Sequence, residues 1–197
     1  MNRLSLYLFL LLFTLQTPSQ ADDIRDYEIE GLSIGSSALD HISEEIIKKN
    51  TWDYYKDKTF TPIQIDHLSF FKTYDAIDIN YKTDDKNYII HGLSGIIMYQ
   101  NNINDCYKKM DKIVLELSKV FEDEVKQEKK KTVPFYEIDK SGKSKLTIVN
   151  FWFDSDDRAS VTCYDYSEEI SNQDHFNISF MTKEFNEFLV YKAYTDK

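Results

Sequence analysis

The two cysteines are the residues of this chain best suited to react with each other. Cys106 lies in a segment of helical periodicity, on the same side as the apolar residues, and Cys163 lies on the inward side of a predicted strand. Two cysteines in an exported protein usually pair, and their wide spacing lacks the close C-x-x-C geometry of a redox pair. We therefore predict a Cys106–Cys163 disulfide between a helix and a sheet. Two buried free thiols and a redox pair are the alternatives.

No other set of residues has the spacing of a catalytic or metal site. The four histidines are neither at metal-ligand spacing nor close in sequence to a cysteine, which favours structural roles. They are His41, His67, His91 and His175. The 34 acidic residues are too many for a general acid–base pair to be chosen without geometry. The sequence therefore predicts no catalytic residue, no cofactor and no metal ligand.

Three short motifs are interpreted as turns or caps. Gly142-Lys143-Ser144 resembles the end of a phosphate-binding loop, but Glu137 stands where that motif needs its first glycine. The acidic run 154–157 lacks the glycine and the distant glutamate of an EF-hand, so we interpret it, like Asp84-Asp85, as a solvated turn. The segment 31–37 is interpreted as an extended lead-in and a helix cap, not as a serine nucleophile elbow.

Aromatic residues are frequent, with 14 Tyr, 13 Phe and 2 Trp. Three aromatic groups could form the floor of a binding surface for a sugar or a peptide. They are Tyr54-Tyr55, Phe70-Phe71 and Tyr164-Asp165-Tyr166. The alternative is that these rings belong to the core and reflect the residue bias of an AT-rich genome.

The first 21 residues predict a secretory signal peptide. Arg3 precedes a short apolar run at 4–15, and Ser19-Gln20-Ala21 matches the small-x-small pattern of a cleavage site after Ala21. A membrane-spanning helix needs roughly 20 apolar residues, so an uncleaved anchor is the weaker alternative. We expect a periplasmic or secreted protein with no membrane anchor after cleavage.

The predicted mature chain, 22–197, is acidic. Loss of Arg3 from the 24 basic residues, against 34 acidic residues, leaves a net charge of −11. Nucleic acids and anionic lipids bind through lysine and arginine, so this charge disfavours both as partners. It favours a cationic partner, or serves only to keep the protein in solution.

Hydrophobic periodicity predicts one long helix between two groups of strands. At 102–121 apolar residues recur at gaps of three and four, which places them on one side of a helix that Asn102 caps. These residues are Ile103, Cys106, Met110, Ile113, Leu117 and Val120. Alternation predicts strands at 60–65, 76–82, 88–99, 135–138, 146–153, 159–166 and 176–181.

Shorter segments complete the predicted order of elements. A helix at 36–50, in one or two pieces, directs four apolar residues inward. They are Leu39, Ile42, Ile46 and Ile47. A last helix follows Thr182 and runs to 194, and the charged segment 122–133 is expected to be a mobile loop.

This order predicts a single α+β domain at 22–197, with a mostly antiparallel sheet packed against the central amphipathic helix. Two helix-plus-strands units in series also raise the hypothesis of an internal duplication. No repeat of individual residues accompanies it.

Several segments resemble small exported proteins of streamlined, AT-rich marine bacteria. They are 29–37, 104–109, 139–144 and 163–165. The resemblance implies a periplasmic location and no particular activity. More loosely, the lead-in followed by a helix is similar to β-lactamase-inhibitor-like envelope modules and outer-membrane assembly lipoproteins. The chain lacks the lipidation cysteine of the latter.

These observations favour a non-enzymatic binding or interaction module, whose partner is a protein or small ligand of the cell envelope. A small envelope hydrolase is the first alternative, and it needs a pocket with two carboxyl groups of raised pKa that are not adjacent in sequence. A carrier of a small aromatic or sugar ligand is the second, and it needs a cavity of roughly 300 Å³ or more.

Overall fold

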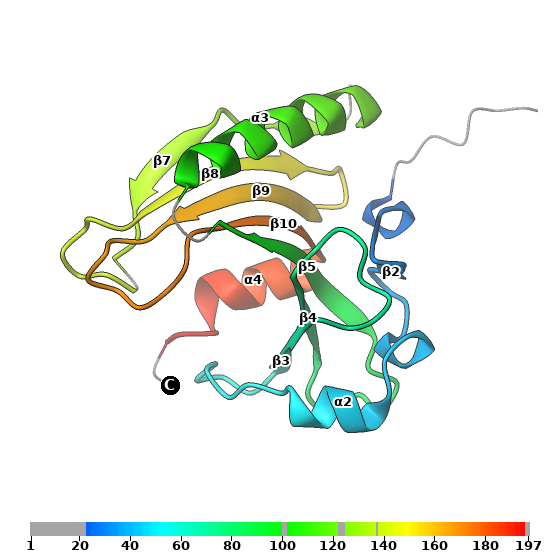
Figure 1. The fold of residues 1–197 in the computed structure, drawn as a ribbon. Helices are drawn as coiled ribbons and strands as arrows, with labels where there is room; N and C mark the ends of the chain where they lie inside the picture. Colours follow the sequence, from blue (N-terminus) through cyan, green and yellow to red (C-terminus); the bar gives the residue numbers. More distant parts are fainter. Residues whose placement is uncertain (1–22, 100–101, 122–124, 137, 196–197) are drawn as a thin grey trace, which may run out of the picture.

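The computed structural model describes residues 23–99, 102–121, 125–136 and 138–195. The predicted signal peptide at 1–21 and its cleavage site at Ala21 lie outside these residues. One antiparallel sheet with helices on both faces forms the framework of the described chain (Figure 1). This is the α+β architecture that the order of strand and helix patterns predicted.

Eight strands form the main sheet. They are β3 (Phe60–Asp66), β4 (Ala76–Lys82), β5 (Ile90–Met98), β6 (Lys126–Gln127), β7 (Lys131–Pro134), β8 (Lys145–Trp152), β9 (Arg158–Asp165) and β10 (His175–Met181). Their order is β3-β4-β5-β10-β9-β8-β6, and β7 also pairs with β8. A two-stranded hairpin of β1 (Glu28–Ile29) and β2 (Leu32–Ser33) precedes them. The β5–β10 pair joins the two halves of the sheet.

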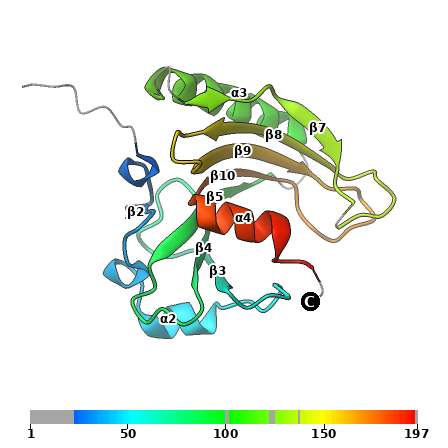
Figure 2. The same ribbon diagram turned by 180° about the vertical axis from the view of Figure 1, so that it is seen from behind.

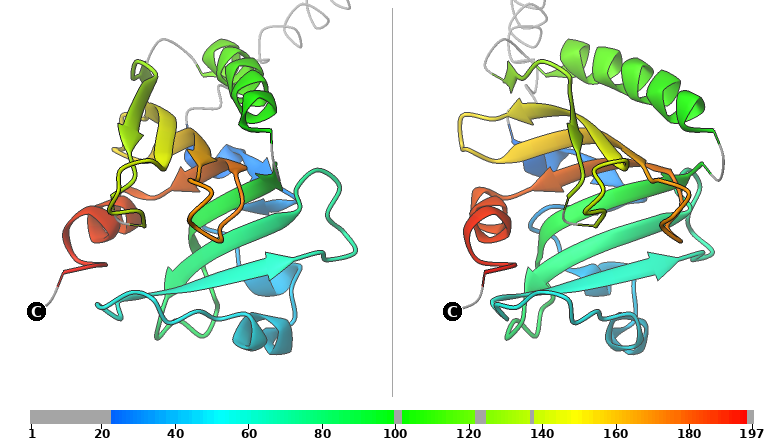
Figure 3. Two further views of the ribbon diagram at one scale, coloured as in Figure 1. Left: turned by 60° about the vertical axis from the view of Figure 1, so that its left-hand side comes forward. Right: turned by 90° about the vertical axis from the view of Figure 1, so that its left-hand side faces the viewer.

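The sheet curves around helix α4 (Lys183–Tyr191), and we call the face toward α4 the concave face (Figures 1 and 3). Seen from behind, α4 lies in front of the sheet and α3 (Ile103–Val120) lies beyond β8 and β9 (Figure 2). The opposite, convex face packs against α3, α2 (Glu44–Lys49) and the N-terminal segment. The hydrophobic core therefore lies on the convex side.

Strand alternation gives the two faces different chemistry. The convex face is apolar and buried. Its residues include Ile63, Ile65, Ile77, Ile79, Leu93, Val149, Val161, Phe176, Ile178 and Phe180. On the concave face, cross-strand pairs form one polar row over six strands. The row is Gln64, Asp78, Ser94, Ser179, Ser160 and Asn150. Such a row contributes little to a hydrophobic core.

Helix α3 uses the predicted stripe, with two corrections. Cys106 and Met110 are fully buried, but Val120 is 52% exposed because the helix ends there and the next residue, Phe121, turns into the core. Asn102 occupies the N-cap position without capping the backbone. Its side-chain amide instead donates to the carboxylate of Asp105.

The helical segment before the sheet forms two pieces, each with a serine cap. Ser37 caps a 3-10 helix (Ala38–Asp40), and Ser43 caps α2. Ile42 and Ile47 are buried as predicted, whereas Leu39 is 42% exposed. The break in the helix rotates Leu39 away from the core, so the prediction that it faces inward was wrong.

Apart from β6 and β7, which extend the second half alone, the strand order is symmetric about the β5–β10 pair. Each half then contains a three-stranded meander that follows a helix on the convex side, α2 in the first half and α3 in the second. This topology agrees with the hypothesis of two helix-plus-strands units. The helices differ in length, with 6 residues in α2 and 18 in α3, and α4 has no counterpart in the first half.

The charged segment 122–133, predicted as a loop, contains β6 and the start of β7. Both strands expose their side chains, so backbone pairing with β8 holds them in place without apolar burial. The hairpin strand predicted at 135–138 is therefore displaced to 131–134. Sequence patterns missed these strands because their side chains contribute nothing to a core.

Helix α4 packs on the concave face over a second apolar cluster. Thr182 caps it by accepting a hydrogen bond from the backbone N–H of Phe185 at 3.2 Å. The cluster is Tyr55, Phe60, Phe185, Phe188 and Ala193. It covers only one end of the concave face, close to β3 and the start of β5.

We expect Gly92→Ala to destabilise the protein by about 1–3 kcal/mol, as overpacking of a filled core does. A Cβ at Gly92 would stand 2.4 Å from the ring of Phe185, so α4 would have to move. Urea unfolding measures the loss. In a Phe185→Ala background the ring is absent and the same substitution should cost far less. An equal loss in both backgrounds would contradict this explanation.

Candidate functional site

The predicted disulfide is present. Cys106 of α3 and Cys163 of β9 are bonded, with their Cα atoms 6.0 Å apart and both side chains fully buried. The bond fixes the helix to the convex face of the sheet. A structural disulfide indicates that the protein resides in an oxidising compartment outside the cytosol. None of the described helices is long and apolar enough to cross a membrane.

The Gly142-Lys143-Ser144 motif lies in the connection between β7 and β8 and serves that turn. The carboxylate of Asp139 accepts hydrogen bonds from the backbone N–H groups of Ser141 and Ser144, each at 2.9 Å. Hydrogen bonds from these serines hold the pKa of Asp139 well below its usual range. The N–H groups of Ser141 and Ser144 are therefore already bonded to Asp139 and not free to cradle a phosphate.

The acidic run 154–157 was predicted as a solvated turn, and residues 154–156 are exposed as predicted, but Asp157 is not. Asp157 is buried, and its Oδ1 accepts a hydrogen bond from the backbone N–H of Lys183 at 2.7 Å. Its Oδ2 lies 3.9 Å from the guanidinium of Arg25. Asp157 therefore joins the β8–β9 turn to the first turn of α4. Among the described residues, no three acidic, histidine or cysteine side chains are grouped as a metal site would need.

The lead-in 31–37 contains Gly-x-Ser-x-Gly but not a nucleophile elbow. Ser33 ends β2, and its backbone carbonyl accepts a hydrogen bond from the hydroxyl of Ser36 at 2.8 Å. The glycines on either side, Gly31 and Gly35, both have φ of +83° and form turns. No long helix begins after Ser33, so the motif shapes the chain and carries no nucleophile.

The clearest candidate site is a recess on the concave face beside β3. It has a volume of about 180 Å³ and is lined by Trp52, Tyr54, Pro62, Ile63, Gln64 and Asp78. Asp78 comes from the middle of β4 and is paired with Gln64 across the strands. The recess therefore places one carboxyl group beside two aromatic rings.

Asp78 is an unusual acid because one of its oxygens is enclosed without a partner. Its Oδ1 is buried and accepts no hydrogen bond from the part of the chain that the structure describes. Burial raises the pKa of this carboxyl group to about 7, an effect that a hydrogen bond from Gln64 opposes and the charge of Asp66 reinforces. Near neutral pH the group is thus divided between its neutral and ionised forms.

The aromatic wall of the recess is held by the backbone. The N–H of Trp52 donates to the carbonyl of Pro62 at 2.9 Å, so Trp52 follows the free edge of β3. The rings of Tyr54 and Tyr55 contact each other edge to face at 4.6 Å. Trp52 and Tyr54 are about half exposed, at 53% and 49%. The Tyr54-Tyr55 pair predicted to line a binding surface thus lies at the recess.

The other two aromatic groups lie elsewhere. Phe70 and Phe71 pack against the main core cluster, with their rings 5.0 Å apart. Tyr164 and Tyr166 stack at 6.2 Å on the far half of the sheet, and Tyr164 also stacks on His175 at 4.3 Å. Burial raises the pKa of Tyr164, whose hydroxyl is affected by the charges of both Asp78 and Arg158.

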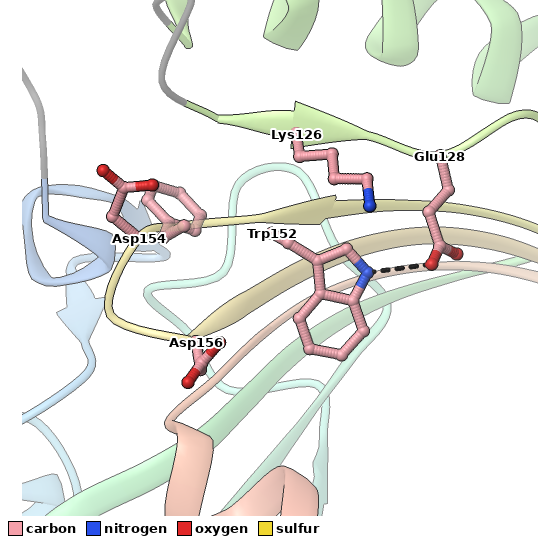
Figure 4. Close-up of a pocket in the computed structure, with 6 residues that line it drawn as sticks. Lys126, Glu128, Trp152, Asp154 and Asp156 are labelled. Carbon is pink, nitrogen blue, oxygen red and sulfur yellow. Dashed lines mark hydrogen bonds between the residues drawn. The ribbon is translucent and has the colours of Figure 1, made fainter.

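A second polar region surrounds Trp152 at the end of β8. Figure 4 shows its indole N–H pointing to Glu128, to which it donates at 3.0 Å. The guanidinium of Arg158 lies 5.5 Å from the indole centroid, and its Nε is buried without a partner among the residues described. The adjoining cavity, about 460 Å³, is open and is lined by Lys126, Glu128, Trp152, Phe153, Asp154 and Asp156.

Unpartnered buried polar atoms gather around the concave face. Within the described ranges there are four such side-chain atoms, on Asp78, Arg158, Ser167 and Asn186. Asp78 and Arg158 point to the concave face, and Asn186 belongs to α4, which covers it. Native proteins leave few buried polar groups unpaired, and each one asks for an explanation. Their side chains mark the concave face as a place where polar groups are kept although the fold does not fully satisfy them.

Comparisons of the chain with models of protein families, with curated proteins and with solved structures found no match. The assignment of a function therefore depends on the chemistry of the concave face.

Proposed function

We propose that this protein is a non-enzymatic binding module of the periplasm, and that its concave sheet face is the binding surface. The observation that carries the proposal is the carboxyl group of Asp78, which has one buried oxygen without a partner and lines a recess together with two aromatic side chains. A polar floor, exposed aromatic walls and an unsatisfied charged group are the usual parts of a small binding site. The rest of the concave face supplies a second buried atom without a partner among the described residues, Nε of Arg158.

The periplasmic location is supported by three features of different kinds. The N-terminal sequence has the pattern of a signal peptide, with Ala21 before the cleavage point. The disulfide needs an oxidising compartment. The resemblance to small exported bacterial proteins points the same way. Fractionation of cells that express the full chain, with N-terminal sequencing, should find a mature protein that begins at Asp22.

A two-carboxylate hydrolase is less well supported. Burial raises the pKa values of Asp78 and of Asp165. Asp78 lies on the concave face, whereas Asp165 lies on the convex face, where the hydroxyl of Tyr107 donates to it at 3.3 Å. Two acids on opposite faces of a sheet cannot act on one bond. The recess is also smaller than an enclosed carrier cavity.

A ligand panel tests the proposal. We would titrate the full mature chain with alkylamines, carboxylates, sugars, aromatic acids and short peptides, and record the unfolding temperature and the tryptophan fluorescence. A ligand at 100 times its Kd stabilises the folded state by about 2.7 kcal/mol. We expect at least one class of ligand to raise the unfolding temperature of the native sequence. The same rise is expected in Asp84→Asn, a control at an exposed acid. It should be absent from a variant that combines Asp78→Asn and Arg158→Gln.

Two outcomes would overturn the proposal. In one, no class changes the unfolding temperature or the fluorescence at millimolar concentration. In the other, the stabilisation persists in the combined variant, which would place the binding surface outside the concave face.

A further inference from the structure

We infer that the Asp78 recess is a subsite for a primary ammonium group, which binds the carboxylate of Asp78 between the rings of Trp52 and Tyr54. The inference depends on the proposed function and specifies the chemistry of its ligand. The group can come from a small free amine or from a lysine side chain of a peptide. Both present the same cation on a flexible alkyl stem.

The charge of the recess selects a cation. No described lysine or arginine forms an ion pair with Asp78, so its carboxylate has no counter-ion from the protein. A buried carboxylate without a counter-ion is costly, and a cation that enters the recess removes that cost. The net charge of −11 in the mature chain adds a long-range attraction for cationic ligands.

The walls of the recess favour a cation over a neutral polar group. Trp52 and Tyr54 line the same small volume as Asp78. An aromatic ring face attracts a cation within about 6 Å, and tryptophan does so most strongly. Burial raises the pKa of Tyr54 to about 12, so this ring stays neutral and keeps that property at physiological pH.

The shape of the recess favours ammonium over guanidinium. Oδ1 of Asp78 is enclosed, which leaves Oδ2 as the oxygen that a ligand can reach. A guanidinium binds best when its planar fork meets both oxygens, whereas an ammonium is compact and bonds well to one. About 180 Å³ is room for roughly six water molecules at 30 Å³ each, which suits an alkylammonium stem.

Isothermal titration calorimetry with matched ligands tests the inference. The probes are cadaverine and Nα-acetyl-lysine amide as the two sources of the ammonium group. Their controls are 1-pentanol and the Nε-acetylated form of the lysine derivative, which keep the stem and lose the charge. We expect both amines to bind and both controls to bind at least tenfold more weakly. Tighter binding of one amine identifies the source.

Variants localise the binding. Asp78→Asn should raise the Kd of the amines at least tenfold, and Trp52→Ala by about threefold to fivefold, as loss of one partly exposed cation–π contact would. Asp84→Asn should leave the Kd unchanged. With Trp152→Phe, Trp52 is the only remaining tryptophan, and its fluorescence should change on binding.

Proton release gives a readout that a purely structural role would not change. The cation favours the ionised carboxyl group, so binding near pH 6 should release a proton and binding at pH 8.5 should not. Other titratable groups near Asp78 are Asp66 of β3, Tyr54 and Tyr55 before β3, Tyr164 of β9 and Tyr194 after α4. Burial raises the pKa values of Tyr54, Tyr55 and Tyr164, so these hydroxyl groups keep their protons between pH 6 and 8.5.

The inference is overturned if neither amine binds, or if Asp78→Asn leaves their Kd unchanged. If another class of the ligand panel still binds through the concave face, the proposed function stands and only the ammonium subsite is rejected. If nothing binds, both are rejected.

Discussion

Replacing Cys106 by alanine should lower the free energy of unfolding by about 4 kcal/mol under oxidising conditions. The bond between Cys106 and Cys163 closes a loop of 57 residues. In the chain-entropy account, a cross-link over such a loop removes about 14 cal/mol/K of conformational entropy from the unfolded state, or about 4 kcal/mol at 25 °C. Urea unfolding of the native sequence and the variant measures the difference.

Reductant separates the cross-link from packing. When the disulfide of the native protein is reduced, it loses the same constraint, so the difference from Cys106→Ala should shrink to the packing loss of one sulfur. Cys163→Ala and the double variant should behave like Cys106→Ala. Met110→Ala, on the same buried stripe of α3, is the packing control and should cost the same with and without reductant. If Cys106→Ala follows the Met110 pattern, the residue acts by packing.

The elements that fill the core could be predicted from the sequence. β4 has the predicted bounds 76–82, because Ile77 and Ile79 alternate with polar residues. The stripe of α3 identified the helix face that meets the sheet, and it placed Cys106 on the buried side. Periodicity reports burial on one face of an element, so it succeeds wherever burial decides the structure.

The candidate site could not be predicted in the same way. Asp78 alternates with isoleucines just as a solvated residue would, and its neighbours on the concave face come from five other strands. The recess itself needs the β3–β4 pairing, which sets Gln64 opposite Asp78, and the rest of the polar row needs the β5–β10 pairing, which joins segments about 80 residues apart in the chain. Local patterns contain no information on that pairing.

Asp157 and the segment 126–134 also could not be predicted from local sequence patterns. Asp157 is buried and accepts a hydrogen bond from the first turn of α4, but in the sequence it cannot be told from the solvated aspartates beside it. Strands that bury no apolar side chain, such as β6 and β7, leave no hydrophobic pattern to detect. Only the partners that the fold provides distinguish these residues from ordinary surface positions.

Asp78→Asn should stabilise the ligand-free protein at pH 8 and change little at pH 4. The usual pKa of an aspartate is 3.8, and burial raises that of Asp78 to about 7. Between these values the folded state holds a proton that the unfolded state has lost. The group therefore contributes stability at low pH, and this contribution is lost as the pH rises through 7. Asparagine cannot ionise, so the variant avoids that loss.

The rise in the pKa of Asp78 from 3.8 to about 7 sets an upper limit of about 4 kcal/mol for the gain in unfolding free energy of Asp78→Asn at pH 8. The side chain is half-buried, so solvent screening should reduce the measured gain to about 2 kcal/mol. Urea unfolding at pH 4, 6 and 8 measures it, and Asp84→Asn should show no such pH dependence. Most substitutions of partly buried residues destabilise. If Asp78→Asn stabilises the protein only above neutral pH, the ionised carboxyl group of Asp78 does not serve the stability of the fold, which would support a role in binding.

Addition of an amine provides the decisive comparison at pH 8. A bound ammonium group supplies the missing counter-ion, so saturating cadaverine should stabilise the native sequence and leave the stability of Asp78→Asn unchanged. The difference in unfolding free energy between the two proteins should therefore become smaller. If Asp78→Asn is instead less stable than the native sequence at every pH, the carboxyl group has a structural role. Direct titration of the Asp78 carboxyl carbon by NMR would then show a pKa near 4. A pKa near 7 in the free protein that falls when cadaverine is added would place the ligand at the Asp78 carboxyl group.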